Sequence, residues 1–262
     1  MSEYEAKVSE LPPESAWEPE SLRLTLFHNR DIVEQTWWKD LFGTSADKID
    51  DQPKKLLHIE EGQFGNGKLL QIIQLGRIDW QYVIDLEKGI EIEEETPLTL
   101  GEFPSAVDVF LKQMLKWFEL QTCPSAYRLA FGVVLLQKVE SLKTGYKLIE
   151  KYLPDVKLYP ECMSDFMYRI NKPRESKTGI EGLKINRLAT WSVAGYTLMR
   201  GIIPITGLGK NFQYPEKFAC RLELDINTSQ EYQSEFDQEG MPEILRELVE
   251  LGREIAQKGD IL

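Results

Sequence analysis

Apolar and polar residues alternate along several short stretches of the chain and recur at helical spacing along others. The stretch "LRLTLF" at 22–27 alternates in the way that a strand with one buried face does. In "FPSAVDVFLKQMLKWFEL", 103–120, apolar residues recur every three or four positions, and Pro104 suits the first turn of a helix. The two spacings predict a chain that mixes strands with amphipathic helices.

The same pattern predicts the other elements. Further strands are expected at 56–59, 68–75, 77–86, 126–137, 165–171, 182–199 and 218–227, with a weaker acidic alternation at 89–96. Further helices are expected at 30–43, 140–154 and 241–259. The polar stretch 44–55 is expected to be a loop.

The order strand, helix, two or three strands, helix occurs twice. We therefore expect an α+β fold of two similar halves, each with helices on one face of a mostly antiparallel sheet. The halves would be 21–122 and 123–262, either separate or joined in one compact unit. Residues 1–20 are rich in Pro and Glu and are expected to form a flexible arm.

One glycine-rich stretch imitates a nucleotide-binding loop. "EGQFGNGKLLQ" places Gly62, Gly67 and Lys68 in the order G-x-x-x-x-G-K. A phosphate loop needs Ser or Thr after the lysine and then a helix, whereas here Leu69 opens a β-rich run. Asn66-Gly67 between apolar runs is typical of a hairpin turn instead.

Composition narrows the class of protein. The net charge of −12 opposes general binding to duplex DNA. No run reaches the roughly 18 apolar residues of a membrane span, and the acidic N-terminus has no apolar signal segment. Three cysteines without a repeated spacing fit a reducing compartment, so we expect a cytoplasmic protein without a membrane contact.

The sequence carries no signature of catalysis, of a metal site or of a cofactor. Its two histidines, His28 and His58, have no metal-ligand spacing. A Cys/His pair could involve Cys162 or Cys220, but a cysteine within "KFACRLEL" is typically a small core residue. The acidic run 85–95 is read as a solvated segment, with a landing site for a basic partner as the alternative.

One segment reverses the acidic character of the chain. If 165–171 and 182–199 pair as a hairpin, basic side chains gather on it and on the glycine-rich turn that follows. The candidate binding residues are Arg169, Lys172, Arg174, Lys177, Lys184, Arg187 and Lys210. Such residues can hold an acidic protein, a phosphate or a nucleic acid, or simply keep an exposed edge soluble.

The strings "SDFMYRINKPRESKTGIEGLKINRLATWSV" and "CRLELDIN", with the closing helix, give the second half a family resemblance. It is similar to a sporadically distributed group of bacterial proteins of similar length and uncharacterised function. The resemblance implies a bacterial cytosolic α+β protein with an accessory role, such as antiviral defence. It supplies no catalytic residues.

We therefore expect a non-enzymatic, complex-forming subunit, such as an adaptor, an antitoxin or immunity protein, or a defence accessory. Its basic hairpin would contact a protein partner or a second copy of the chain, with nucleic acid as a weaker possibility. The alternative is an enzyme or sensor that binds a phosphate-bearing ligand at the same hairpin.

Overall fold

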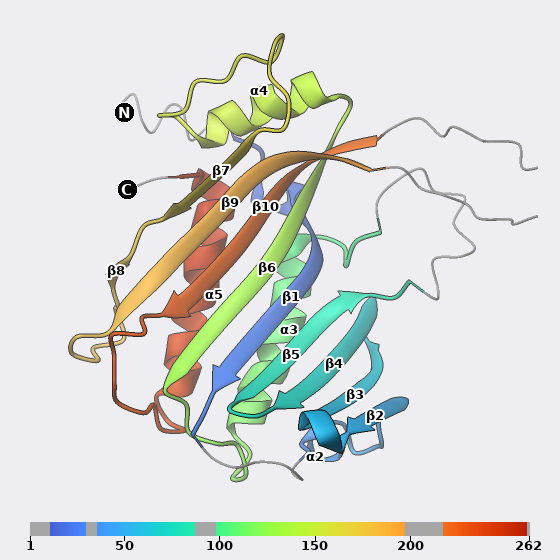
Figure 1. The fold of residues 1–262 in the computed structure, drawn as a ribbon, viewed down its shortest axis with the longest axis vertical. Helices are drawn as coiled ribbons and strands as arrows, with labels where there is room; N and C mark the ends of the chain where they lie inside the picture. The colour runs from blue at the N-terminus through green and yellow to red at the C-terminus, as the bar shows by residue number, and fades with distance from the viewer. Residues whose placement is uncertain (1–10, 30–35, 87–97, 197–216, 261–262) are drawn as a thin grey trace, which may run out of the picture.

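The computed structural model describes residues 11–29, 36–86, 98–196 and 217–260. Within these residues, ten strands form one sheet, in which every neighbouring pair runs antiparallel (Figure 1). The strands are β1 (Glu18–Phe27), β2 (Lys48–Gln52), β3 (Leu57–Phe64), β4 (Gly67–Gln74), β5 (Arg77–Ile84), β6 (Arg128–Val139), β7 (Met167–Asn171), β8 (Arg174–Glu175), β9 (Lys184–Tyr196) and β10 (Lys217–Thr228). Their order across the sheet is β2-β3-β4-β5-β1-β6-β10-β9-β7, and β8 also pairs with β9.

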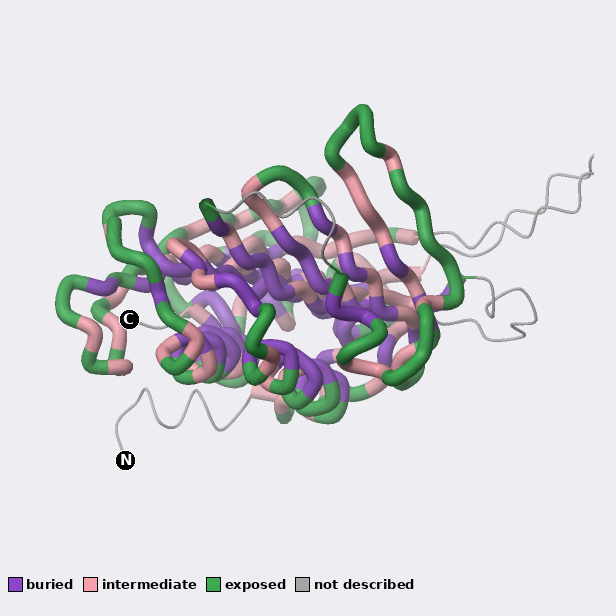
Figure 2. The backbone as a smooth tube through the Cα atoms, turned by 90° about the horizontal axis from the view of Figure 1, so that it is seen from below, coloured by how far each residue is buried: buried purple, intermediate pink, exposed green. Residues whose placement is uncertain are grey.

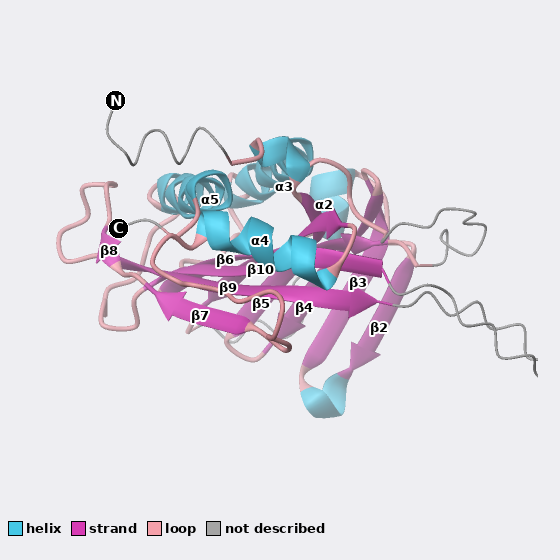
Figure 3. Ribbon diagram, turned by 90° about the horizontal axis from the view of Figure 1, so that it is seen from above, coloured by secondary structure: helices cyan, strands magenta, loops and turns pink. Residues whose placement is uncertain are grey.

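The α-helices of the described residues lie on one face of this sheet (Figure 3). They are α2 (Trp38–Phe42), α3 (Phe103–Phe118), α4 (Leu142–Tyr152) and α5 (Met241–Lys258). Helix α3 packs on β1, α4 on β9 and β10, and α5 on β6 and β10. The expected α+β class is confirmed, with the sheet as the larger part.

Alternation along the strands separates the core from the opposite face. Leu22, Leu24 and Leu26 of β1 are fully buried and point toward the helices. The residues between them, such as Arg23, point to the face without helices, which we call the open face. Figure 2 shows the buried residues concentrated between the helices and the sheet.

The segment that was expected to be a flexible arm joins the fold from residue 11 onward. Trp17 is fully buried, and its indole Nε1 donates a hydrogen bond to the Ala256 carbonyl at 3.1 Å. Strand β1 already begins at Glu18, because the polar residues before 22 still pair with β6. Residues 1–10 lie outside the described residues.

Two other elements differ from the sequence prediction. The stretch 44–55 contains β2 and a short 3-10 helix, Pro53–Lys55, instead of a loop. Strand β2 is an almost fully exposed edge strand, so it has no apolar alternation to reveal it. A helix was expected at 30–43, and its described part, 36–43, is helical only over α2. Gly43, with φ 71°, follows the last residue of α2, in agreement with the predicted end of the helix.

The glycine-rich stretch is a hairpin turn between β3 and β4. Phe64 pairs with Gly67, and Gly65 takes the left-handed φ of 52° that the turn requires. The Asn66 backbone N–H donates to the Tyr82 hydroxyl at 2.9 Å. Lys68 lies 2.9 Å from a Glu61 carboxylate oxygen and 3.4 Å from one of Asp85. The prediction of a hairpin is confirmed.

No helix within the described residues is long and apolar enough to cross a membrane.

Candidate functional site

The predicted basic residues are spread over the outer part of the sheet. Arg169 lies on edge strand β7 and is exposed, and Lys184 and Arg187 lie on β9. Arg174 opens the two-residue strand β8, which pairs with the start of β9. Lys210 lies outside the described residues.

Three of these basic side chains form ion pairs within the chain. Arg174 Nη1 lies 3.1 Å from Oε2 of Glu254 on α5, and Arg187 Nη2 lies 3.8 Å from the same oxygen. Lys172 Nζ lies 2.9 Å from Oδ1 of Asp260, just beyond α5. These contacts fasten the β7–β9 segment to the C-terminal helix, so the three charges have protein partners already.

Arg187 is a buried cation whose ion-pair partner is Glu254. Its side chain is only 6% exposed, and burial lowers the pKa of the guanidinium while the Glu254 carboxylate acts to raise it. A buried charge is tolerated when an opposite charge lies beside it, and Glu254 supplies that charge here. Arg187 is therefore a structural residue on the helix-covered face.

The segment after β8 is also tied to α5. Ser176 Oγ donates to Glu247 Oε2 at 2.6 Å, and the Lys177 backbone N–H donates to Glu247 Oε1 at 2.8 Å. The side chains of Lys177 and Lys184 remain exposed, as does that of Arg169. Among the predicted residues that the structure describes, these three remain available for an external partner.

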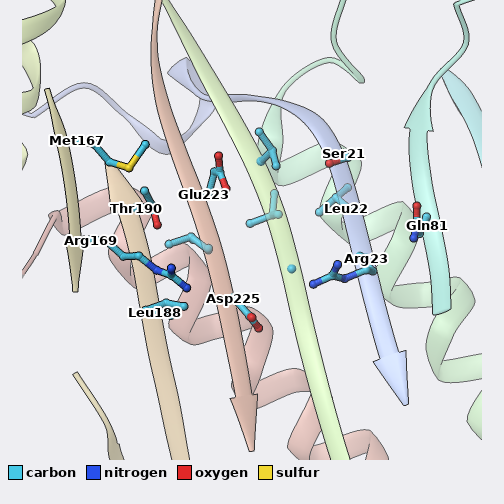
Figure 4. A pocket seen from close by; sticks show the side chains of 14 residues that line it. Ser21, Leu22, Arg23, Gln81, Met167, Arg169, Leu188, Thr190, Glu223 and Asp225 are labelled. Atoms are coloured by element: carbon cyan, nitrogen blue, oxygen red, sulfur yellow. The ribbon is translucent and has the colours of Figure 1, made fainter. Parts of the chain in front are cut away.

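A groove runs across the middle of the open face, where strands from both parts of the chain meet (Figure 4). Its volume is about 440 Å³, which falls within the range of small-ligand pockets. It brings one predicted residue, Arg169, together with residues that the sequence prediction did not select. The side chains that matter most below are Arg23, Asp225, Leu188, Thr190 and Met167.

Strand register places Arg23 in a row that crosses the groove. Arg23 on β1 is opposite Gly132 on β6, Gly132 is opposite Asp225 on β10, and Asp225 is opposite Leu188 on β9. Arg23 Nη2 would be 3.2 Å from a Cβ built on Gly132. The missing side chain at Gly132 therefore makes room for the guanidinium over the sheet.

The charges in the groove are only partly balanced. Glu223 is paired with Arg221, and Asp225 accepts a hydrogen bond from Asn227 Nδ2 at 3.1 Å. Within the described residues, neither Arg23 nor Arg169 has an ion pair or a hydrogen bond, and the Arg23 Nε is buried without a partner. The groove thus holds two cations and one carboxylate, that of Asp225, which forms no ion pair within the described residues.

A polar network holds the neighbouring part of the open face. Thr25 Oγ1 donates to Asp79 Oδ1 at 2.5 Å, and Arg77 Nε lies 2.6 Å from Asp79 Oδ2. Arg77 and Arg128 place their guanidinium carbons 5.7 and 5.3 Å from the Phe27 ring centre. These hydrogen-bond, ion-pair and cation–π contacts form a polar cluster beside the groove.

The residues considered for a Cys/His pair do not line this groove; they are Cys162, Cys220, His28 and His58. Cys123 and Cys220 are buried on the core side, where burial raises the pKa of each thiol to about 12. His58 lies 3.6 Å from carboxylate oxygens of both Asp51 and Glu60. Among the described residues there is no group of three His, Cys, Asp or Glu side chains that could hold a metal ion.

Comparison of the chain with protein-family models, with curated proteins and with solved structures finds no match.

Proposed function

We propose that the chain is a non-enzymatic binding subunit that joins a partner protein through the open face of its sheet. The observation that carries the proposal is the groove, where Arg23 and Arg169 lack partners among the described residues. Unpaired guanidinium groups at a sheet surface are well suited to hydrogen-bond a partner. An adaptor, an antitoxin or immunity protein, and a defence accessory all act by such binding.

The site of this function differs from the expected one. The hairpin residues Arg174 and Arg187 are paired with Glu254 of α5, and Lys172 with Asp260 just beyond it. Among the predicted basic residues that the structure describes, Arg169 is the one that lines the groove. A phosphate-bearing ligand at the hairpin, the alternative function, finds fewer free cations there and is the weaker proposal.

We also propose that the chain consists of two related halves, each with the order strand, helix, strands, helix. The strand order supports this: β5, β4 and β3 follow β1 outward, as β10, β9 and β7 follow β6. Strands β1 and β6 pair at the centre. The groove would then lie where the halves meet, which is a preferred place for binding sites.

Co-purification from the cells that naturally make the protein tests the binding function. The double variant Arg23→Glu with Arg169→Glu should lose a partner that the wild-type chain retains. The matched control is Lys54→Glu with Lys55→Glu, which makes the same change in net charge at two exposed positions away from the groove. Retention by the groove variant, or a wild-type chain that is a strict monomer without partners, would count against the proposal.

A further inference from the structure

We infer that the groove recognises an acidic segment of the partner, with an Asp or Glu carboxylate placed between Arg23 and Arg169. This inference rests on the proposed binding function and names the chemistry of the partner. A second copy of the chain, a basic segment or a phosphorylated segment would be a different occupant.

Charge is the first argument. Arg221 neutralises Glu223, so the charges left in the groove are those of Arg23, Arg169 and Asp225. Their sum is one positive charge. An added carboxylate would balance this excess positive charge, whereas an added cation would increase it.

The positions of the two arginines are the second argument. Figure 4 shows their guanidinium groups reaching toward the middle of the groove from opposite sides, Arg23 from β1 and Arg169 from β7. Asp225 of β10 lies on the floor between them. A guanidinium binds a carboxylate through two parallel hydrogen bonds, so either arginine offers a directed contact to an entering acid.

The burial of Arg23 is the third argument. Its Nε is buried and has no hydrogen-bond partner among the described residues. A buried donor without a partner is unfavourable, and an acceptor that reaches it on binding would satisfy it. Gly132 contributes by leaving the space in which this guanidinium lies.

The other side chains of the groove indicate which type of residue the partner segment should carry next to its Asp or Glu. Leu188 and Val134 line the floor, and Met167 is 69% exposed at its margin. These groups offer apolar contact area, so the segment should carry an aliphatic residue next to its acid. The net charge of −12 repels an acidic partner at a distance, so recognition depends on contacts inside the groove.

Site-specific photo-crosslinking tests the inference. A benzophenone amino acid replaces Met167, and the cross-linked partner segment is identified by mass spectrometry from the cells that make the protein. Leu75, in the turn between β4 and β5, is the matched control, because it too is 69% exposed but does not line the groove. The cross-links from position 167 should fall in a segment with Asp or Glu beside an aliphatic residue.

A second measurement ties the cross-link to the arginines. Arg23→Gln with Arg169→Gln should lower the yield from position 167 by at least about tenfold, while the yield from position 75 stays unchanged. A cross-link to a second copy of the chain or to a basic, neutral or phosphorylated segment would overturn the inference and leave the binding function standing. A yield that the arginine variant leaves intact would do the same. The absence of any cross-link from position 167 would overturn both.

Discussion

The guanidinium of Arg23 on β1 lies over Gly132 on β6, with Nη2 3.2 Å from the place where a Cβ would stand. The glycine has no left-handed backbone angle that would require it, so its function at this position is to leave space. The relationship joins the first and second parts of the chain at the centre of the groove.

A side chain at this position should displace the arginine without unfolding the protein. Gly132→Val adds a residue that strands favour, so the free energy of unfolding should change by less than about 1 kcal/mol. Partner binding should fall by at least about tenfold, because the guanidinium loses its place. Denaturant titration measures the stability and co-purification measures the binding. Full partner binding by a stable variant would show that Gly132 has no role in the binding site.

Loss of Glu254 should loosen the attachment of the β7–β9 segment to α5. Glu254→Gln leaves Arg174 and Arg187 without their anionic partner, and the Arg187 side chain is 6% exposed. We expect the free energy of unfolding to fall by about 1–3 kcal/mol. The exposed pair of Arg246 and Glu243 provides the control, since Glu243→Gln should cost less than about 1 kcal/mol in urea unfolding. Equal losses for the two variants would contradict the proposed role of Glu254.

The buried thiols make stability depend on alkaline pH. Burial raises the pKa of Cys123 and Cys220 from an ordinary 9.0 to about 12, so the folded state keeps protons that the unfolded state releases between these values. The free energy of unfolding should therefore fall as pH rises through this window, by up to about 1.4 kcal/mol per pH unit for each thiol.

The variant Cys220→Ala isolates one thiol in that pH series. Its free energy of unfolding should decline less steeply than that of the wild type, by up to the contribution of a single group. Chemical unfolding at several pH values measures both slopes. Identical slopes would show that Cys220 is not buried in the protonated form.

Trp17 should anchor the N-terminal segment to the last helix. Trp17→Phe keeps an aromatic ring but removes the hydrogen bond to the Ala256 carbonyl. We expect a loss of about 1–3 kcal/mol in the free energy of unfolding, because the carbonyl loses its partner in a buried place. Thermal and urea denaturation measure it, and a neutral result would mean that residues 11–17 are not packed as described.

Local patterns predicted most of the strands and the longer helices because burial sets their spacing. The apolar positions of β1 and of α3 repeat at the spacing of their own geometry. Strand β2 escaped detection because an exposed edge strand needs no apolar face. The sequence also did not indicate that α2 is short, since Trp37 and Trp38 suit either a helix or a buried turn.

The groove could not be predicted from local patterns. Ser21, Arg23 and Thr25 alternate with leucines, which indicates that they share the polar face of a strand. Which residues lie beside this face depends on the order of the strands in the sheet, and local patterns do not give that order. Asp225 and Arg169 come close to that row only because β10 and β7 lie in the same sheet. For the same reason, the sequence did not show that the basic segment has partners within the chain. Arg174 binds Glu254, which lies 80 positions away in the sequence.

Hydroxyl-radical footprinting of the chain, alone and with its co-purified partner, tests most directly that the open face is the binding surface. Met167, 69% exposed at the groove, should lose most of its oxidation in the complex. Tyr159, 54% exposed and outside the groove lining, should keep its reactivity. Protection of Tyr159 with none at Met167 would place the partner elsewhere and contradict the account.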